Sequence, residues 1–280
     1  MGVQTAHAVA QRKTAMNWML RDVHALEHML GEAMFDRSHP HIGAEQEMFL
    51  VDSAWQASPI AAELLELVAD HHFTHEIGAF NLEINLDPQR FEGSCFRLLH
   101  EQLDSLLAEG RRAAHTLDHE IVLSGILPTL RLGDIQLTNM VQNPRYLALN
   151  EALMEMRGED VDLQISGIDE LHVRHGSVMA EACNASFQVH LQVTPDEFAN
   201  TYNLAQLVAG PTLSACTNSP ILFGKHLWAE TRIPLFEQSV DTRRSGQHLR
   251  QREGRVTFGS RWVQESVAEL FKEDITRYRP

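Results

Sequence analysis

The sequence predicts one domain of the α+β class, mainly an antiparallel sheet with helices packed on one face. Segments with apolar residues at helical spacing are mixed irregularly with short segments whose apolar residues alternate or run together. No internal repeat, low-complexity tract or long Gly/Ser/Pro linker divides the 280 residues. The chain can also bury a substantial core, because 44% of its residues are hydrophobic and 22% are charged.

Six segments are predicted to be helices from their apolar periodicity. These are residues 14–34, 59–69, 96–117, 146–156, 195–209 and 260–275. The fifth has the strongest start signal, since Thr194 can cap it, Pro195 takes its first position and Glu197 completes a capping box. We treat residues 1–40 as an N-terminal helical segment and residues 41–280 as the main domain, within one compact unit.

Five shorter segments are predicted to be strands because their apolar residues alternate or form short runs. These are residues 42–51, 81–86, 121–127, 162–165 and 186–193. Side chains point alternately to the two faces of a strand, so three of these segments place their polar residues on a single face. We therefore expect each of the three to pack one face against the core and to present the other to a ligand or to solvent.

The polar faces of these three strands are rich in carboxylates and amides. Glu45 and Glu47 are two residues apart in the first strand, Glu83 lies between two asparagines in the second, and Gln188 and His190 alternate in the third. If the strands share a sheet, these five side chains form a floor suited to hard cations such as Mg²⁺, bound together with a nucleotide. The alternative is an ordinary solvated sheet face, where the same residue types are common.

The net charge excludes two classes of partner. The chain carries 23 basic and 38 acidic side chains, a formal charge of −15, which is the wrong sign for a phosphate backbone or an anionic membrane surface. We therefore expect neither a nucleic acid nor a membrane partner. Three cysteines without CxxC spacing indicate neither a disulfide framework nor a zinc knuckle, and we identify no export signal. A cytoplasmic location fits these features best.

The first acidic strand carries a motif that resembles a known family. IGAEQEMFLVD at Ile42–Asp52 resembles the G-x-E-x-E-x-x-L-V-D opening of the glutamate-cysteine ligase and carboxylate-amine ligase family, which has a glutamine synthetase-like fold. Further resemblances follow in the family's order, so that they cover nearly everything after residue 40. They are FNLEINLDP at Phe80–Pro88, GILPTLRLGDIQLTNMVQNPRY at Gly125–Tyr146, NASFQVHLQV at Asn184–Val193, NSPILFGKHLWAETRIPLFEQSVDTR at Asn218–Arg243 and FGSRWVQESVAELFKEDI at Phe258–Ile275.

This resemblance implies an ATP-dependent ligase. In the family, ATP phosphorylates the γ-carboxylate of glutamate, and the amine of cysteine or another amino compound attacks the acyl phosphate to give an amide, ADP and phosphate. With cysteine as the acceptor, the reaction belongs to glutathione biosynthesis. By resemblance, Glu45, Glu47 and Glu83 match family positions that bind Mg²⁺, and Gln188 stands where some members have a metal-binding histidine. His190 is then expected beside the nucleotide or the metal.

Three basic residues lie in the segment that resembles the family's substrate-contacting stretch. We assign a catalytic role to Arg232, whose guanidinium can grip a carboxylate or phosphate with two hydrogen bonds. Arg243 and Lys225 are secondary candidates for nucleotide binding, although the Gly-Lys pair lacks the rest of a P-loop. The alternative for Arg232 is a surface arginine paired with Glu230 or Glu237.

Most histidines and cysteines receive no functional role. None of the 16 histidines has the HExxH spacing of a zinc-binding helix. Cys183 and Cys216 are expected to be buried, inert thiols. The histidines that we interpret as solvated loop and strand-end residues rather than ligands are His39, His41, His71, His72, His75, His172 and His175.

The sequence departs from the family in one respect. Relatives continue through a late strand resembling H-L-R-I-E-N-R, which supplies another Mg²⁺-binding glutamate and a substrate-binding arginine, and this motif does not occur here. We therefore expect a family member that lacks its C-terminal part, with an incomplete fold. Each lost electrostatic contact would cost about 3 to 4 kcal/mol of transition-state stabilisation. A missing central strand would expose a sheet edge that a second copy can cover, so a homo-oligomer is plausible.

Three functions are consistent with the sequence. The first is a glutamate-cysteine ligase or related carboxylate-amine ligase. The second is a noncatalytic relative that binds a nucleotide or an amino acid without turnover. The third is a structural subunit, which predicts no magnesium-dependent nucleotide binding. The sequence does not specify the acceptor amine.

Overall fold

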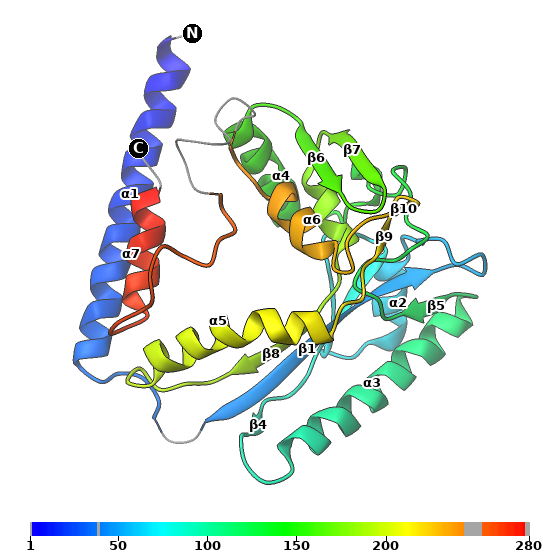
Figure 1. Ribbon diagram of the computed structural model, residues 1–280, viewed down its shortest axis with the longest axis horizontal. Helices are drawn as coiled ribbons and strands as arrows, with labels where there is room; N and C mark the ends of the chain where they lie inside the picture. The colour runs from blue at the N-terminus through cyan, green and yellow to red at the C-terminus, as the bar shows by residue number, and fades with distance from the viewer. Residues whose placement is uncertain (1, 38–39, 244–253, 278–280) are drawn as a thin grey trace. The chain divides into compact units, whose positions relative to one another are not determined.

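The computed structural model describes residues 2–37, 40–243 and 254–277 (Figure 1). Its contacts divide the chain into two compact units. The larger comprises His41–Leu191 and Pro211–Thr257, and the smaller comprises Met1–Pro40, Gln192–Gly210 and Phe258–Pro280. One boundary lies between residues 40 and 41, where the sequence also placed one. Two later segments group with the N-terminal helix, so the contacts show two units where the sequence predicted one.

The larger unit is built around an antiparallel sheet with a long central strand. Strand β1 (His41–Val51) has 11 residues, enough to pair with several shorter strands along its length. The sheet has six strands in the order β2-β3-β1-β4, and β5 and β8 also pair with β1. The shorter strands are β2 (Phe73–His75), β3 (Asn81–Asn85), β4 (Gln89–Arg90), β5 (Glu120–Val122) and β8 (Phe187–Leu191).

One face of this sheet is covered by helices α2 (Ala61–Val68) and α3 (Cys95–Thr116). Met48 and Leu50 of β1 point to this face, where they are fully buried in a hydrophobic core with Leu64 of α2. Figure 1 shows α3 running along the sheet beside β1 and β5. The predicted α+β class, with an antiparallel sheet and helices on one face, is confirmed.

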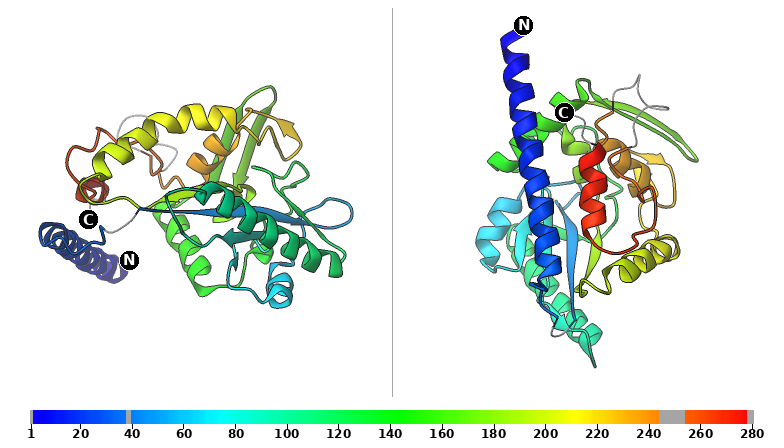
Figure 2. Two further views of the ribbon diagram at one scale, coloured as in Figure 1. Left: turned by 90° about the horizontal axis from the view of Figure 1, so that it is seen from below. Right: turned by 90° about the vertical axis from the view of Figure 1, so that its left-hand side faces the viewer.

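The alternate residues of β1 lead into a second core. Phe49 and Val51 are buried with residues from the segments that follow β5, including Leu163 and Met179. These segments form η1 (Leu137–Asn139), α4 (Pro144–Arg157), β6 (Val161–Ser166), β7 (Glu170–His175), η2 (Val178–Cys183) and α6 (Arg232–Ser239). The β6–β7 hairpin is a separate two-stranded sheet, which stands apart from the main one in Figure 2. Phe49 and Val51 thus lie in a core at the C-terminal end of one face of β1. Glu45 and Glu47 lie on the same face, nearer the start of the strand.

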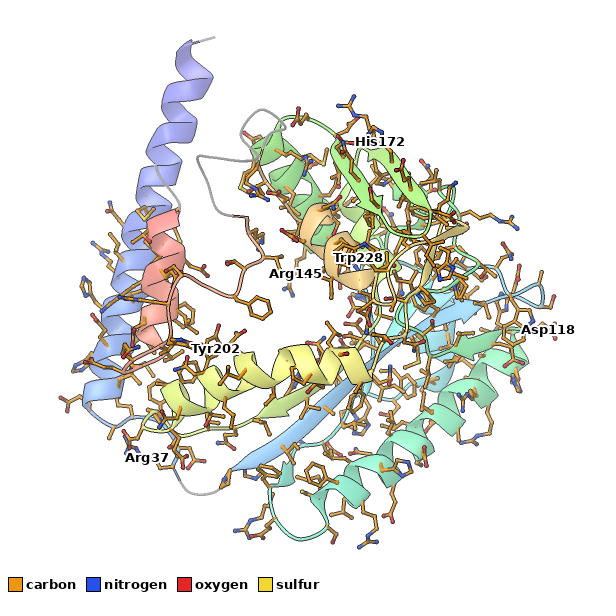
Figure 3. The ribbon with its side chains drawn as sticks, in the orientation of Figure 1. Arg37, Asp118, Arg145, His172, Tyr202 and Trp228 are labelled. Atoms are coloured by element: carbon orange, nitrogen blue, oxygen red, sulfur yellow. The ribbon has the colours of Figure 1, made fainter. Side chains whose placement is uncertain are left out.

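Two turns show how the chain reverses locally. α3 ends at Thr116, and Asp118, which Figure 3 labels, has a positive φ of 59° that redirects the chain into β5. Strands β9 (Ile221–Leu222) and β10 (Lys225–His226) are joined by two residues with positive φ, Phe223 at 49° and Gly224 at 74°. Positive φ at both central residues is typical of the type I′ hairpin turn.

The smaller unit is largely helical. It contains α1 (Gly2–Gly31), α7 (Ala268–Arg277) and most of α5 (Phe198–Ala215). α1 and α7 pack together and carry an ion pair between Glu27 and Lys272. Among the helices of the described residues, none combines the length and the apolar character that crossing a membrane requires.

Several element boundaries differ from the prediction. Thr194 donates a hydrogen bond to Glu197 Oε2 over 2.8 Å, but α5 begins only at Phe198 and continues through Pro211. The predicted helix at 260–275 begins at Ala268, and the predicted strand at 121–127 ends at Val122. The short strands β2, β4, β9 and β10, the strand β7 and the helix α6 were not predicted, because segments of two to eight residues carry little periodic signal.

Candidate functional site

Three glutamates meet on the sheet face opposite α2 and α3. In the antiparallel register of β1 and β3, Glu47 pairs directly with Glu83, and Glu45 lies two residues earlier on the same face as Glu47. One carboxylate oxygen from each residue lies within 4.8 Å of those of the other two. The sequence placed these residues on matching faces, and the strand pairing brings their carboxylates together.

Strand β8 brings the two remaining residues of the predicted floor to the other side of β1. Gln188 is the register partner of Glu45, and His190 is the partner of Gly43. Gln188 Nε2 donates to Glu47 Oε1 over 3.2 Å, and His190 Nε2 lies 3.4 Å from Glu45 Oε2. The five side chains predicted to form one floor are therefore neighbours in the structure.

Main-chain and amide donors hold two of the carboxylates in place. The N–H of Ser186 donates to Glu47 Oε2 over 2.7 Å, while the Glu47 N–H donates to the Ser186 carbonyl over 2.9 Å. Asn85 Nδ2 donates to Glu83 Oε1 over 2.6 Å. These contacts fix the orientation of Glu47 and Glu83 before any ligand binds, as a preorganised site requires.

Two further glutamates of the site were missed by sequence reasoning. Glu76 lies in the connection between β2 and β3, and Glu181 lies on η2. Burial raises the pKa of Glu76 to about 8, with the negative charges of Glu47, Glu83 and Glu181 adding to the effect. Burial also raises the pKa of Glu181 to about 7, again with a contribution from the charge of Glu47. A loop and a short 3₁₀ helix carry no periodic signal that points to these residues.

The electrostatics of this face favour a cation. Burial raises the pKa of Glu45 and of Glu47, and the charges of neighbouring glutamates raise both further. Among the residues that the structure describes, no lysine or arginine forms an ion pair with Glu45, Glu47 or Glu83. Grouped carboxylates of this kind are costly to ionise alone, whereas a divalent cation with oxygen ligands offsets their repulsion. The donor set therefore fits Mg²⁺.

Tyr146 is an aromatic residue that contacts the edge of this site. It belongs to α4, whose start Asn143 caps by accepting a hydrogen bond from the main-chain N–H of Arg145. The Tyr146 hydroxyl lies 3.4 Å from His75 Nδ1, with the two rings packed edge to face. Burial raises the pKa of Tyr146, and the negative charge of Glu76 raises it further.

Arg232 forms an ion pair with the carboxylate of Glu230, two residues away. Its Nε and Nη2 atoms donate to Glu230 over 2.6 and 2.9 Å, which is the pairing that the sequence offered as the alternative. Its Nη1 atom donates to the carbonyl of Ala185 over 2.8 Å. The bidentate interaction expected with a substrate is thus made with Glu230. A direct catalytic role for Arg232 stays a prediction.

The other two basic candidates lie in different settings. Arg243 forms an ion pair of 2.7 Å with the buried Asp241. Lys225 is exposed at the start of β10, directly after the two-residue turn. Nucleotide binding by either residue stays a prediction.

Two expectations about histidines and cysteines need correction. His72, expected to be solvated, has a side chain only 14% exposed that contacts Asp70 at 2.7 Å and Asp87 at 3.2 Å. Burial opposes protonation of His72, but the two carboxylates outweigh it and raise its pKa. Cys183 is buried as predicted, and burial raises the pKa of its thiol. Cys216, directly after the end of α5, is exposed and not buried as predicted. His39 lies outside the described residues.

One comparison with known proteins agrees with the family that the sequence motifs resemble. A family model described as glutamate-cysteine ligase family 2 matches residues 41–264. Among solved structures, the chain is similar to a bifunctional glutathione synthetase from Pasteurella multocida, with 15% identity and a TM-score of 0.41. That match covers 66% of this chain and 24% of the other. No curated protein matches the sequence.

Proposed function

The chain belongs to glutamate-cysteine ligase family 2, and we propose that it joins the γ-carboxylate of glutamate to an amine with ATP and Mg²⁺. Cysteine is the first acceptor to test, since the family is named for it. The family model covers the whole of the larger compact unit, including every strand that contributes to the acidic face. The proposed activity therefore belongs to that unit.

The observation that supports this proposal best is the convergence of Glu45, Glu47 and Glu83. Their oxygens lie within 4.8 Å of one another, and burial raises the pKa of Glu45 and of Glu47. Such a group fits a hard divalent cation, and transfer of a phosphoryl group from ATP needs one to neutralise the charge that develops. Glu76 and Glu181 add two more carboxyl groups beside the same three.

The proposed reaction has two steps. A γ-carboxylate oxygen of glutamate takes the terminal phosphoryl group of ATP, which releases ADP and forms an acyl phosphate. The amine nitrogen then attacks the acyl carbon, loses a proton and expels phosphate, leaving an amide. We assign Glu45, Glu47 and Glu83 to holding the cation, with Gln188 positioned beside Glu47 and His190 beside the nucleotide. Preorganised carboxylates of this kind act mainly by orientation and charge stabilisation.

One structural feature supports the second candidate, a family member that binds nucleotide without turnover. Arg232 and Arg243 are both engaged by carboxylates two residues away, Glu230 and Asp241. Two of the three cationic side chains predicted to hold substrate are therefore already neutralised. Positioning a transferring phosphoryl group normally requires such cations in addition to the metal.

The test measures magnesium-dependent ADP formation with glutamate and a panel of amines, beside calorimetry of nucleotide binding. The variant is Glu47→Gln, which removes one charge from the site. The matched control is Glu63→Gln, which removes one exposed charge from helix α2 on the opposite sheet face.

Turnover that needs glutamate and is lost in Glu47→Gln but kept in Glu63→Gln supports the ligase. Magnesium-dependent nucleotide binding without ADP formation supports the binding protein instead. Absence of both overturns the assignment of the acidic face as a cation site.

A further inference from the structure

A chain of contacts connects the buried Glu230 to Glu47, the central carboxylate of the acidic face. Arg232 donates to Glu230 through Nε and Nη2, and its third group, Nη1, donates to the Ala185 carbonyl over 2.8 Å. The N–H of the same peptide unit, which belongs to Ser186, donates to Glu47 Oε2 over 2.7 Å. One peptide group therefore has the guanidinium on its oxygen and the carboxylate on its N–H.

We propose that Arg232, held by Glu230, is a positioning residue for Glu47 that acts through the peptide between Ala185 and Ser186. Hydrogen bonds in series polarise one another, so a guanidinium on the peptide oxygen strengthens donation from the peptide N–H. Each of the two hydrogen bonds of this peptide has one charged partner, Arg232 at the oxygen and Glu47 at the N–H. Charge-assisted hydrogen bonds are shorter and stronger than neutral ones. The Glu47 carboxylate is thereby held in one orientation.

The surroundings of Arg232 leave it little freedom to move away. Glu230 is 5% exposed, and its carboxylate also accepts hydrogen bonds from the Ser219 hydroxyl and from the main-chain N–H of Asn218. A side chain added at Gly125 would approach Arg232 Nε to 2.8 Å, so the guanidinium lies directly against this glycine. The N–H of Ala185 also donates to the Gly125 carbonyl over 3.0 Å.

This geometry gives Arg232 a role different from direct contact with substrate. All three of its nitrogen groups are engaged with protein acceptors, so its hydrogen bonds reach Glu47 through the peptide group, while its charge is also close enough to attract that of Glu47. Partners one step removed from a metal ligand typically change metal affinity by about 10- to 100-fold when they are lost. The inference rests on the proposed function, because it takes Glu47 as a cation ligand.

The experiment compares Arg232→Met and Arg232→Lys with Arg157→Met. Arg157 is the matched control because it also donates to main-chain carbonyls, those of Asp160 and Asp241, and is even more buried than the partly buried Arg232. The first readout is the dissociation constant for Mn²⁺, the probe cation, measured by electron paramagnetic resonance without substrates. The second is the amide resonance of Ser186 in the metal-free protein.

The Ser186 amide can be observed selectively. With ¹³C-carbonyl alanine and ¹⁵N-serine, only Ala–Ser peptides give a carbonyl-edited signal, and the chain contains Ala57–Ser58 and Ala185–Ser186. The first is an internal reference, since the Ser58 N–H donates to the Leu50 carbonyl within the larger unit. The second reports the hydrogen bond to Glu47 directly.

We expect Arg232→Met to weaken Mn²⁺ binding about tenfold and to move the Ser186 amide proton upfield. The Ser58 amide proton should not move in this variant. Arg157→Met should change neither the Mn²⁺ affinity nor the Ser186 amide shift. Arg232→Lys should recover part of both effects, because an ammonium group can still donate to the Ala185 carbonyl. If Arg232→Met does not fold, Arg232→Lys alone carries the test and should show a smaller change in the same direction.

An unmoved Ser186 amide in a folded Arg232 variant overturns the proposal, as does equal weakening of Mn²⁺ binding in Arg157→Met. Failure of the proposed function has a different signature. If the unmodified protein does not bind Mn²⁺ while its Ser186 amide still responds to Arg232→Met, the positioning contact exists and the cation assignment is wrong.

Discussion

Two groups of charged residues in the larger unit differ in how their charges are neutralised. On the sheet face, Glu45, Glu47 and Glu83 lie together and receive their contacts from amides, a histidine and the main chain. In the segment from Ser219 to Arg243, each buried carboxylate instead has an arginine two residues away.

The difference separates charges that bind a ligand from charges that build the fold. A buried ion pair satisfies itself and adds rigidity, and it has no need of an external partner. Grouped carboxylates without cationic partners raise the free energy of the ion-free protein, so they persist only where something else compensates them. The comparison therefore supports the proposal that the sheet face binds a cation, whereas the two arginines are engaged by protein carboxylates.

The largest expected effect is on activity, from removing one charge of the acidic face. We expect Glu83→Gln to lower magnesium-dependent turnover about 10²- to 10³-fold, equivalent to about 3 to 4 kcal/mol. The free energy of unfolding without Mg²⁺ should rise in the same variant, because one repulsive charge is gone. Steady-state kinetics and urea unfolding measure the two quantities. The control Glu66→Gln changes an exposed residue of α2 and should alter neither quantity. A destabilised Glu83→Gln would contradict the comparison.

The opposite pattern is expected for the paired region. Asp241 is 5% exposed and forms a 2.7 Å ion pair with Arg243, so Asp241→Asn removes one charge of a buried pair and should lower the free energy of unfolding by about 3 kcal/mol. Mn²⁺ affinity at the sheet face should stay unchanged. The exposed pair Arg97–Glu101 is the reference, and Glu101→Gln should cost about 0.5 kcal/mol or less. Urea denaturation measures both; equal costs would remove the distinction between buried and surface pairs.

The pH dependence of stability should separate the regions next. The pKa values of Glu76 and Glu181 are about 8 and about 7 in the folded protein, above the ordinary value of 4.5. Between pH 4.5 and about 8, the folded chain therefore binds more protons than the unfolded chain. The free energy of unfolding consequently falls as the pH rises through this range. One pKa unit corresponds to about 1.4 kcal/mol, so we expect a loss of at least this size.

Two comparisons check the origin of this slope. The free energy of unfolding, measured with urea across the pH range, should depend less on pH in Glu76→Gln, because glutamine cannot ionise. Saturating Mg²⁺ should also reduce the pH dependence of the unmodified protein. Asp241→Asn should keep the slope of the unmodified protein. A slope that survives Glu76→Gln unchanged would place its origin outside the acidic face.

The smallest expected effect concerns Lys225, a predicted nucleotide-binding cation that forms no ion pair with any residue in the described ranges 2–37, 40–243 and 254–277. If it contacts a phosphate from its exposed hairpin, Lys225→Met should raise the KM for ATP about fivefold, close to 1 kcal/mol, without changing stability. Gly133→Ala, at a site where an added side chain meets nothing within 4 Å, is a control for unrelated surface change. An unchanged KM would remove Lys225 from the site.

The sequence was sufficient for those parts of the site that lie on regular strands. Alternation of side chains predicted that Glu45 and Glu47 share a face, that Glu83 lies between two asparagines on its face, and that Gln188 and His190 share another. The ordered motifs pointed to the family that the model over residues 41–264 confirms. These features depend on local geometry, which a stretch of five to ten residues specifies by itself.

Only the tertiary structure decided which faces meet and which charges pair. Ser186 and Glu47 are 139 positions apart, and their hydrogen bond depends on β8 pairing with β1, which no local pattern encodes. Glu76 and Glu181 joined the site from a loop and a 3₁₀ helix, where the sequence has no period to follow. The sequence had offered Glu230 as a partner of Arg232, because the two residues are close in the chain. The contact of Arg232 with the Ala185 carbonyl, 47 positions away, depends on long-range packing, which only the folded chain has.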